Sequence, residues 1–568
     1  MKMKRMLCVL LAALMLPAGA VHAEAGEPLT KTVLANVALF KPVKASCDNS
    51  SYAKSNMADD DFSTLWTGDI PADDPDFNGA VSPKWLQVDL QRRCPIERIE
   101  LWDRRDAGNT PGSREHFEII GANCEDLSDG VRLGGLEEAD TALFPKGGKF
   151  TLELPEKTAY RYVCVRKTKF PADVCYSEIK VYAMQTVTEV SREKPVLADT
   201  EFHVQYSAKK AVNGTNIDDG DCWISSFDTD LYRYLQVDLQ KARYIGMVEI
   251  EGRNTGGGPD DGGTRNSIAL YGANTEVDHA LFTKNAKIKD NPNYKQLTDL
   301  NNPSGYSDYY PFPVYNQGAG KERGIYRVTM DDSEPFRYLI YKKTYLNVAM
   351  VGQIRAFEIN PVLLSCSSDG GALKVCFSDE MDAGTVNPES LVLTRKDTGK
   401  AVDYDVEEID GYDFRLIPKE KIYGTSVSVA VTDSVKSTRG VKAAGAEPFK
   451  ISFPHILNAE DIRFVNSEGE TINNLIPGET AGISLTAENL GENGEQTYFL
   501  AVCLYDADNT MVSVSGKTGK IAPGAKEQLT AELVLPGGSL DGYTLSAYFW
   551  DGVAPAKRWI DSKKIGGQ

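Results

Sequence analysis

The stretch WLQVDLQRRCPIERIEL, residues 85–101, alternates apolar and polar residues in the way that a half-buried β-strand requires. The alternation places Leu86, Val88 and Leu90 on one face of the strand and the intervening polar residues on the other. We therefore assign the three apolar side chains to the core of a β-sheet, and the strand itself to the scaffold.

Almost the same stretch returns, without a gap, as YLQVDLQKARYIGMVEI at 234–250. Three further pairs of segments match in the same order: 114–123 with 265–274, 160–168 with 336–344, and 176–182 with 351–357. A repeat of this length indicates two tandem domains rather than a solenoid of short units. The second copy carries a long insertion near 283–325.

Short alternating runs separated by Gly, Pro, Asn and Asp continue through the rest of the chain. This pattern predicts an all-β protein. The segments 362–455 and 456–568 contain no copy of the repeat. At roughly 100 residues each, they have the size and strand spacing of immunoglobulin-like sandwiches.

The N-terminus reads as a secretory signal peptide, with a basic start, an apolar core and a small-residue cleavage site at Val21-His22-Ala23. We expect residues 1–23 to be removed and the protein to be secreted, extracellular, and held at a cell surface only through what it binds. No later segment is apolar enough to cross a bilayer. The formal net charge of −19 argues against nucleic acid as a partner.

Ten cysteines are present, and all except Cys8 follow the expected signal peptide. They are scattered and show no zinc-ligand spacing. Export permits disulfides, but an odd number of scattered cysteines does not define a pairing. Buried free thiols remain the alternative.

Several segments in fixed order resemble a factor V/VIII type C, or discoidin, domain: NVALFKPVKAS (36–46), ADDDFSTLW (58–66), WLQVDL (85–90) and SEIKVY (177–182). Bacterial relatives of this family include the family 32 carbohydrate-binding modules. The resemblance implies a galactose-binding-like jelly roll whose loops at one end carry the ligand.

The resemblance places the first discoidin-like domain at 33–185 and the second, matched less completely, at 196–361. Residues 377–382, FSDEMD, together with 415–441, resemble a bacterial Ig-like domain, which we place at 362–455. The last segment resembles an Ig-like or fibronectin-like domain only generically. The expected fold is therefore all-β: two tandem galactose-binding-like jelly-roll sandwiches followed by two Ig-like β-sandwiches.

A structural calcium site is expected in the first copy. Asp59, Asp61 and Thr64 offer hard oxygen ligands within six residues, and the resemblance implies that Glu178 on the last strand completes the site. Asp60 stands where the family usually has Gly, in a turn that prefers positive φ. The alternative is a solvated acidic turn.

The matching positions of the second copy are Asn213 and Gln353. These neutral amides replace two charged ligands, and calcium affinity depends on ligand charge. We therefore expect a weak or absent calcium site in the second copy.

A polar loop, RRDAGNTPGSR, runs from Arg104 to Arg114. The resemblance implies that Arg104 and Asn109 hydrogen-bond sugar hydroxyls, and we include Asp106 and Arg114 in this ligand face. A planar guanidinium with several donors suits neighbouring hydroxyls. The alternative is that Arg104 pairs with Asp106 and merely braces the loop.

Sugar binding also requires an aromatic face, for which the candidates in the expected end loops are Tyr52, Phe77, Phe170 and Tyr176. In the second copy Arg253 keeps the arginine, but Gly258 replaces the asparagine. The two copies are therefore expected to differ in specificity.

No motif for a catalytic serine, a zinc protease or a phosphate-binding loop is found, and four β domains account for the chain. We favour a secreted, non-catalytic protein that binds glycans or cell-surface glycoconjugates. An extracellular adhesin or structural protein that binds a surface protein is the alternative, and an uncharacterised hydrolase is favoured least.

Overall fold

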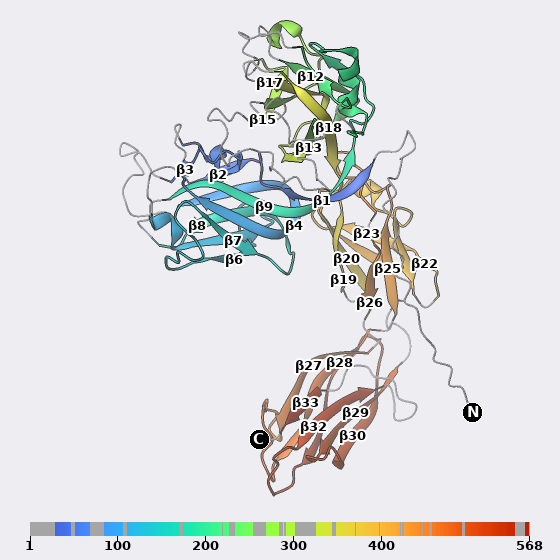
Figure 1. The fold of residues 1–568 in the computed structure, drawn as a ribbon. Coiled ribbons are helices and arrows are strands. Elements are labelled where there is room, and N and C mark those ends of the chain that lie inside the picture. The colour runs from blue at the N-terminus through green and yellow to red at the C-terminus, as the bar shows by residue number, and fades with distance from the viewer. Residues whose placement is uncertain are drawn as a thin grey trace, which may run out of the picture.

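The computed structural model describes residues 29–46, 52–68, 84–105, 111–169, 174–217, 220–226, 233–253, 268–282, 288, 291–300, 325–343, 348–369, 371–396, 398–420, 422, 425–445, 447–453, 457–490, 495–550 and 563–566. Strands dominate these residues and form a series of two-sheet sandwiches (Figure 1). The all-β prediction is confirmed.

The first sandwich contains two short 3₁₀ helices and nine strands. Its elements are β1 (Thr30–Asn36), β2 (Val43–Ala45), η1 (Lys54–Ala58), β3 (Trp66–Thr67), β4 (Trp85–Asp103), η2 (Pro111–Arg114), β5 (Phe117–Ala122), β6 (Val131–Leu136), β7 (Lys149–Glu153), β8 (Ala159–Lys167) and β9 (Cys175–Glu189).

Strand β4 belongs to both sheets of this sandwich. Its first half pairs with β2 and β8, and its second half pairs with β7 and β9. Leu86, Val88 and Leu90 are at most 1% exposed and pack between the sheets, as predicted. A 19-residue strand can serve both sheets because it turns a corner at Gln91, whose φ is 66°.

The second sandwich repeats this corner. Gln240, the counterpart of Gln91, has φ 67°. In this copy the long strand is divided into two shorter strands, which are separated after Arg243. The elements are β10 (Val196–Ala198), η3 (Val204–Tyr206), η4 (Ala208–Val212), β11 (Trp223–Ile224), β12 (Tyr234–Arg243), β13 (Met247–Gly252), β14 (Ile268–Ala273), η5 (His279–Phe282), β15 (Tyr294–Leu300), β16 (Ile325–Thr329), β17 (Phe336–Lys343) and β18 (Met350–Ile359). One sheet is β10-β12-β17-β14-β15, and the other contains β16, β13, β18 and β11.

Part of the predicted insertion is a strand of the second sandwich. Strand β15 pairs with β14, and Tyr294 at its start is 5% exposed. The Tyr294 hydroxyl donates to the carbonyl of Glu276 at 3.0 Å and accepts from the N–H of Asp278 at 2.9 Å. This tyrosine is therefore part of the fold and not of a recognition surface.

The last strands of the two copies pair with each other. Phe357 and Ile359 of β18 lie opposite Glu189 and Val187 of β9, so a sheet of the first sandwich continues into the second. Met247, Phe357 and Ile359 also join the core of the first sandwich. The two copies thus share a sheet and part of a core.

The C-terminal sandwiches each have two sheets around their own core. The third contains β19 (Leu363–Asp369), β20 (Ala372–Phe377), η7 (Ala383–Thr385), β21 (Leu391–Arg395), β22 (Ala401–Val402), β23 (Tyr404–Glu408), β24 (Asp413–Pro418), β25 (Ser426–Val431) and β26 (Phe449–Ser452). The fourth contains β27 (Leu457–Asn466), β28 (Thr480–Asn489), β29 (Gln496–Tyr505), β30 (Met511–Ile521), β31 (Lys526–Val534), β32 (Thr544–Trp550) and β33 (Lys563–Gly566). Their assignment as Ig-like stays a prediction.

The cysteines in the described part of the chain are free thiols. Cys94, Cys164, Cys175, Cys222 and Cys503 are buried. Burial raises the pKa of Cys94 and of Cys164 to about 12, which keeps these thiols protonated and unreactive. These five buried cysteines therefore behave as small core residues, whereas Cys124 is exposed.

A buried cluster of charges joins the first three sandwiches, and we call it the charge junction. Arg92, at the corner of β4, pairs with Asp332 of the second sandwich and, at 2.9 Å, with Asp379 of the third. Lys41 of the first sandwich and Arg439 of the third also reach Asp332, at 3.4 and 3.2 Å. One carboxylate thus receives cations from both neighbouring sandwiches.

Protonation of Asp332 is linked to the stability of the charge junction. Burial alone would raise the pKa of Asp332, but the charges of Arg92, Lys41 and Arg439 outweigh burial and hold the pKa below its ordinary value. A carboxyl group with a depressed folded-state pKa contributes its full stabilisation above the unfolded pKa of about 3.9. That contribution is lost as the pH falls below this value toward the folded-state pKa.

The charge junction predicts the effect of Asp332→Ala. Removing the carboxylate leaves the buried Arg92 and Lys41 without compensation, and breaking a buried pair in this way costs about 3–5 kcal/mol. Denaturant unfolding of the full chain measures the loss. The control is Asp433→Ala in the third sandwich, because Asp433 is 74% exposed and its pair with Lys442 is open to solvent.

We expect the control to unfold like the wild type. We also expect the wild type to lose stability between about pH 4 and pH 2 more steeply than Asp332→Ala does. Equal stability of the two variants would contradict the role of the charge junction.

Candidate functional site

The loop at 59–64 follows η1 and lies against β9, and it brings three of the predicted calcium ligands together. Asp59 accepts a hydrogen bond from the N–H of Asp61 at 2.9 Å and another from the Thr64 hydroxyl at 3.0 Å. Glu178 of β9 accepts from the N–H of Asp60 at 3.0 Å. Asp61 differs from the prediction, because its carboxylate accepts from the N–H and the hydroxyl of Ser63 instead.

The carboxyl groups of Asp59 and of Glu178 on β9 lie in an environment that disfavours their negative charge. Burial raises the pKa of Asp59 to about 8. Burial and then the charge of Asp59 raise the pKa of Glu178 well above its ordinary value. Oxygen Oε1 of Glu178 is buried and has no hydrogen-bond partner among the residues described. A bound cation would remove both penalties.

The donor set fits a hard cation. It comprises the carboxylates of Asp59 and Glu178, the hydroxyl of Thr64 and nearby main-chain carbonyls, and Ca²⁺ takes six to eight such oxygens. Within the described ranges, no group of three or more His, Cys, Asp or Glu side chains is placed to hold a metal. Main-chain oxygens would therefore have to supply much of the coordination.

In the second copy neutral side chains occupy the two matching positions, and Asn213 also donates to the carboxylate of Asp221 at 2.8 Å. Gly214 donates its N–H to Gln353 at 2.9 Å, and Thr215 donates to Asn213 at 2.9 Å, matching the bonds of Asp60 and Asp61 in the first copy. The amide nitrogen of Gln353 lies 2.8 Å from Oδ1 of Asn213 and 2.6 Å from the carbonyl of Lys210. An N–H donor is therefore placed among oxygens that would otherwise surround a cation.

The departure at Asp60 has a structural explanation. Asp60 has φ 59°, and its counterpart Gly214 has φ 82°, so both turns use the left-handed region that favours glycine. Asp tolerates this region better than most residues. Its carboxylate pairs with Lys180 and, at 3.3 Å, with the hydroxyl of Tyr326 in the second sandwich. A glycine could not make these contacts, which tie the loop to both sandwiches.

Part of the predicted ligand face braces the first sandwich instead of facing a ligand. Arg114 ends η2, its side chain is 12% exposed, and it pairs with Asp103 at 3.2 Å. Asp103 also accepts from the N–H of Gly147 at 2.9 Å. The prediction that Arg114 is a ligand donor is thus corrected, because its guanidinium holds the loop to the end of β4.

Arg104 directly follows β4 and is partly exposed. Asp106 and Asn109 lie outside the described residues, so the pairing of Arg104 with Asp106 stays an open alternative.

The four predicted aromatic residues have different outcomes. Tyr52 is 43% exposed, and Phe77 and Phe170 lie outside the described residues. Tyr176 was expected in an end loop, but it lies within β9, is fully buried, and donates its hydroxyl to the carbonyl of Ser113 at 2.7 Å. This prediction is wrong, because the register of β9 shifts opposite Trp102 and Asp103, which breaks the alternation and leaves Tyr176 in the same core as Ile179.

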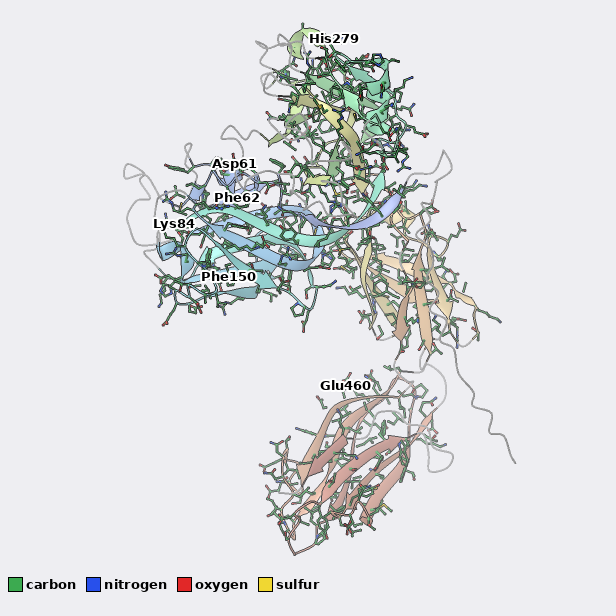
Figure 2. The ribbon with its side chains drawn as sticks, viewed as in Figure 1. Asp61, Phe62, Lys84, Phe150, His279 and Glu460 are labelled. Atoms are coloured by element: carbon green, nitrogen blue, oxygen red, sulfur yellow. The ribbon has the colours of Figure 1, made fainter. Side chains whose placement is uncertain are left out.

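An aromatic pair that the sequence analysis missed lies beside Arg104. Phe62 of the 59–64 loop, labelled in Figure 2, meets Trp102 of β4 edge to face, with ring centroids 4.7 Å apart. The guanidinium of Arg105 lies 5.4 Å from the Phe62 ring and 5.8 Å from the Trp102 ring. Both rings are partly exposed. The alternation of β4 could have revealed Trp102, which follows the inward-facing Leu101.

Cations border this aromatic pair on its other sides. Lys180 lies 4.8 Å from the centre of the Phe62 ring, and Lys149 lies 5.2 Å from that of Trp102. In the second copy Arg253 stacks over Tyr206 of η3 at 5.6 Å. Both copies therefore place an arginine on an aromatic ring near the end of the matching strand.

Neither a family model nor a curated protein matches the chain. Among solved structures, it is similar to an F-lectin (fucolectin) from striped bass (Morone saxatilis) serum, at 14% identity over 58% of this chain and 99% of that one, with a TM-score of 0.22. It is similar to the family 32 carbohydrate-binding module from Clostridium perfringens NanJ in complex with galactose, at 15% identity over 27% and 99%, with a TM-score of 0.21.

A fucose-binding module from Streptococcus pneumoniae, SpX-3, matches at 17% identity over 26% of this chain and 98% of that one, with a TM-score of 0.20. Identities and TM-scores this low carry no conclusion about a ligand, so function must be argued from the site itself. Among the described residues, no helix has the length and apolar character needed to cross a membrane.

Proposed function

We propose that this protein is a secreted, non-catalytic carbohydrate-binding protein whose first sandwich holds the ligand at the Arg104 end. The observation that carries the proposal is the surface made by Phe62, Trp102 and Arg105, which we call the aromatic platform. It combines partly exposed rings with a guanidinium that lies over both of them. Residues 1–23 have the pattern of a signal peptide, which supports export.

The chemistry of the aromatic platform suits a sugar ring. A pyranose has one apolar face of C–H groups, which can pack on an aromatic side chain, and a rim of hydroxyls. Arg104 and Arg105 carry fixed, planar sets of N–H donors that can hydrogen-bond neighbouring hydroxyl oxygens. Lys149 and Lys180 border the rings, and because Lys180 is 14% exposed and paired with Asp60, the further donors come from Lys149, which is 39% exposed.

Binding without catalysis is the more economical interpretation of the charged groups. Among the carboxyl groups, the most strongly shifted pKa values belong to Asp59, to Glu178 of β9 beside it, and to Asp332 of the charge junction. Shifted groups can mark a catalytic site. In this protein, burial and charge pairing around the 59–64 loop and within the charge junction account for these pKa shifts without a catalytic role.

The proposal includes a structural calcium ion in the first sandwich only. Asp59, Thr64 and Glu178 would hold it, together with main-chain carbonyls of the loop. The ion would compensate the buried negative charge and fix the loop that carries Phe62. In the second copy the amide of Gln353 would take over this role without a metal.

Exchanging the charged ligands between the copies tests the calcium proposal. The Asp59→Asn/Glu178→Gln variant should have a melting temperature that neither calcium nor a chelator changes. For the wild-type chain, calcium at about 100 times its Kd should add about 2.7 kcal/mol of stability. The reciprocal Asn213→Asp/Gln353→Glu variant should gain an additional calcium response. An undiminished calcium response in the first variant would contradict the proposed site.

Arg105→Ala tests the sugar proposal, with Arg132→Ala as the matched control because Arg132 lies in β6 and is 51% exposed. Hydrogen bonds from a charged donor contribute about 1.5–3 kcal/mol. We therefore expect Arg105→Ala to weaken binding by about 10- to 100-fold, with an unchanged melting temperature. A glycan array followed by titration calorimetry on the full chain measures this. Wild-type affinity in Arg105→Ala would count against the aromatic platform.

A further inference from the structure

A cavity of about 650 Å³ lies between the first two sandwiches, and Asp59 and Thr64, two of the proposed calcium ligands, are among the residues that line it. One wall is formed by η1 and the 59–64 loop, including Ser55, Asn56 and Asp61. The other wall is formed by β15, including Gln296 and Leu297. Figure 2 shows Asp61 on the side of the first sandwich that is turned toward the second. A cavity of this size at a domain interface is typical of small-ligand sites.

Several contacts hold the two walls in place. Lys41 donates to the carbonyl of Met330 at 2.5 Å, and Gln91 donates to Asp331 at 2.5 Å. The shared pairing of β9 with β18 and the bond between Tyr326 and Asp60 also join the walls. The cavity is therefore formed before any ligand arrives, which lowers the entropic cost of binding.

The lysines in the cavity already have partners. Lys41 belongs to the charge junction, and Lys295 pairs with Asp331 and Glu334, both at 3.2 Å. Asn56 turns its amide nitrogen to the carbonyl of Leu65 at 2.9 Å. Gln296 does the same with the carbonyl of Thr298 at 3.0 Å.

The polar lining therefore offers carboxylate and amide oxygens as acceptors, beside hydroxyl groups and the paired lysines. The amide oxygens of Asn56 and Gln296 face away from their bonded nitrogens, and Asp61 contributes a carboxylate. Phe40 and Leu297 supply apolar surface next to these oxygens. Such a lining selects a ligand that is rich in hydroxyl donors, carries no negative charge, and has an apolar face.

We infer that this cavity is a second carbohydrate site, shared by the two sandwiches, that takes a short neutral oligosaccharide. Hydroxyl groups of the ligand donate to Asn56, Asp61 and Gln296, and a sugar ring packs its C–H face against Phe40 and Leu297. Anionic sugars are disfavoured because Asp61 lines the cavity and the two lining lysines, Lys41 and Lys295, are already paired with carboxylates. This site goes beyond the proposed aromatic platform and does not depend on it.

The test uses an array of neutral, sialylated and sulfated oligosaccharides with the full chain, followed by titration calorimetry with the neutral oligosaccharide that binds best. Gln296→Trp fills the cavity from the second sandwich, and Ser55→Trp fills it from the first. Asn293→Trp is the matched control, because Asn293 is exposed just before β15 and does not line the cavity. Arg105→Ala removes the aromatic platform from the measurement.

In the Arg105→Ala background we expect a neutral oligosaccharide to bind still. Either Trp substitution in the cavity should weaken this binding by at least tenfold, and Asn293→Trp should leave it unchanged. The melting temperature of each variant identifies any variant that fails to fold. If one Trp variant fails to fold, the Trp variant on the opposite wall of the cavity tests the inference. Loss of all binding in Arg105→Ala, unchanged binding in a folded cavity variant, or a preference for anionic sugars would overturn the inference. A different outcome is that a cavity substitution abolishes all binding in a chain that still carries Arg105. That result would count against the aromatic platform and would support this site.

Discussion

The ion pairs around Asp332 are the constraint on which the arrangement of the N-terminal three sandwiches depends. A carboxylate that is 2% exposed is stable only if cations reach it, and here they come from the first and third sandwiches as Arg92, Lys41 and Arg439. The corner of β4 supplies Arg92, and the next residue, Arg93, pairs with Asp410 and Asp413 of the third sandwich. The strand that forms the first core thus also fixes its neighbours. The cavity between the first two sandwiches exists because this arrangement is held.

The duplication kept the framework and changed the chemistry of the loops. Both copies retain the corner with its positive φ and the strand pairing around it. In the 59–64 loop, buried carboxylates require compensation by a cation, whereas the amide of Gln353 in the second copy satisfies the same kind of loop with its own N–H groups. A single loop geometry is therefore stabilised in two ways, one expected to depend on metal and one not. If the first sandwich holds the proposed calcium ion, this difference makes its stability depend on calcium while that of its neighbour does not.

Local patterns in the sequence were sufficient for the sheets and for some loop details. Alternation identified Leu86, Val88 and Leu90 as core, and the match to a glycine position anticipated the positive φ of Asp60. The same alternation in β4 was sufficient to identify Trp102, which follows the inward-facing Leu101. The pairing of Arg92 with Asp332 joins residues 240 positions apart and leaves no periodic signal, so it could not be predicted. The burial of Tyr176 and the brace made by Arg114 likewise depend on tertiary contacts that single-sequence patterns do not encode.

Differential scanning calorimetry of the full chain at neutral pH tests the central claim most directly. If the charge junction and the shared sheet make the first three sandwiches one cooperative unit, they unfold in a single transition whose calorimetric and van't Hoff enthalpies agree. The fourth sandwich, with its own core, is free to give a separate transition. Separate transitions for the first, second and third sandwiches would contradict the account, because each would then be stable without the contacts that join them.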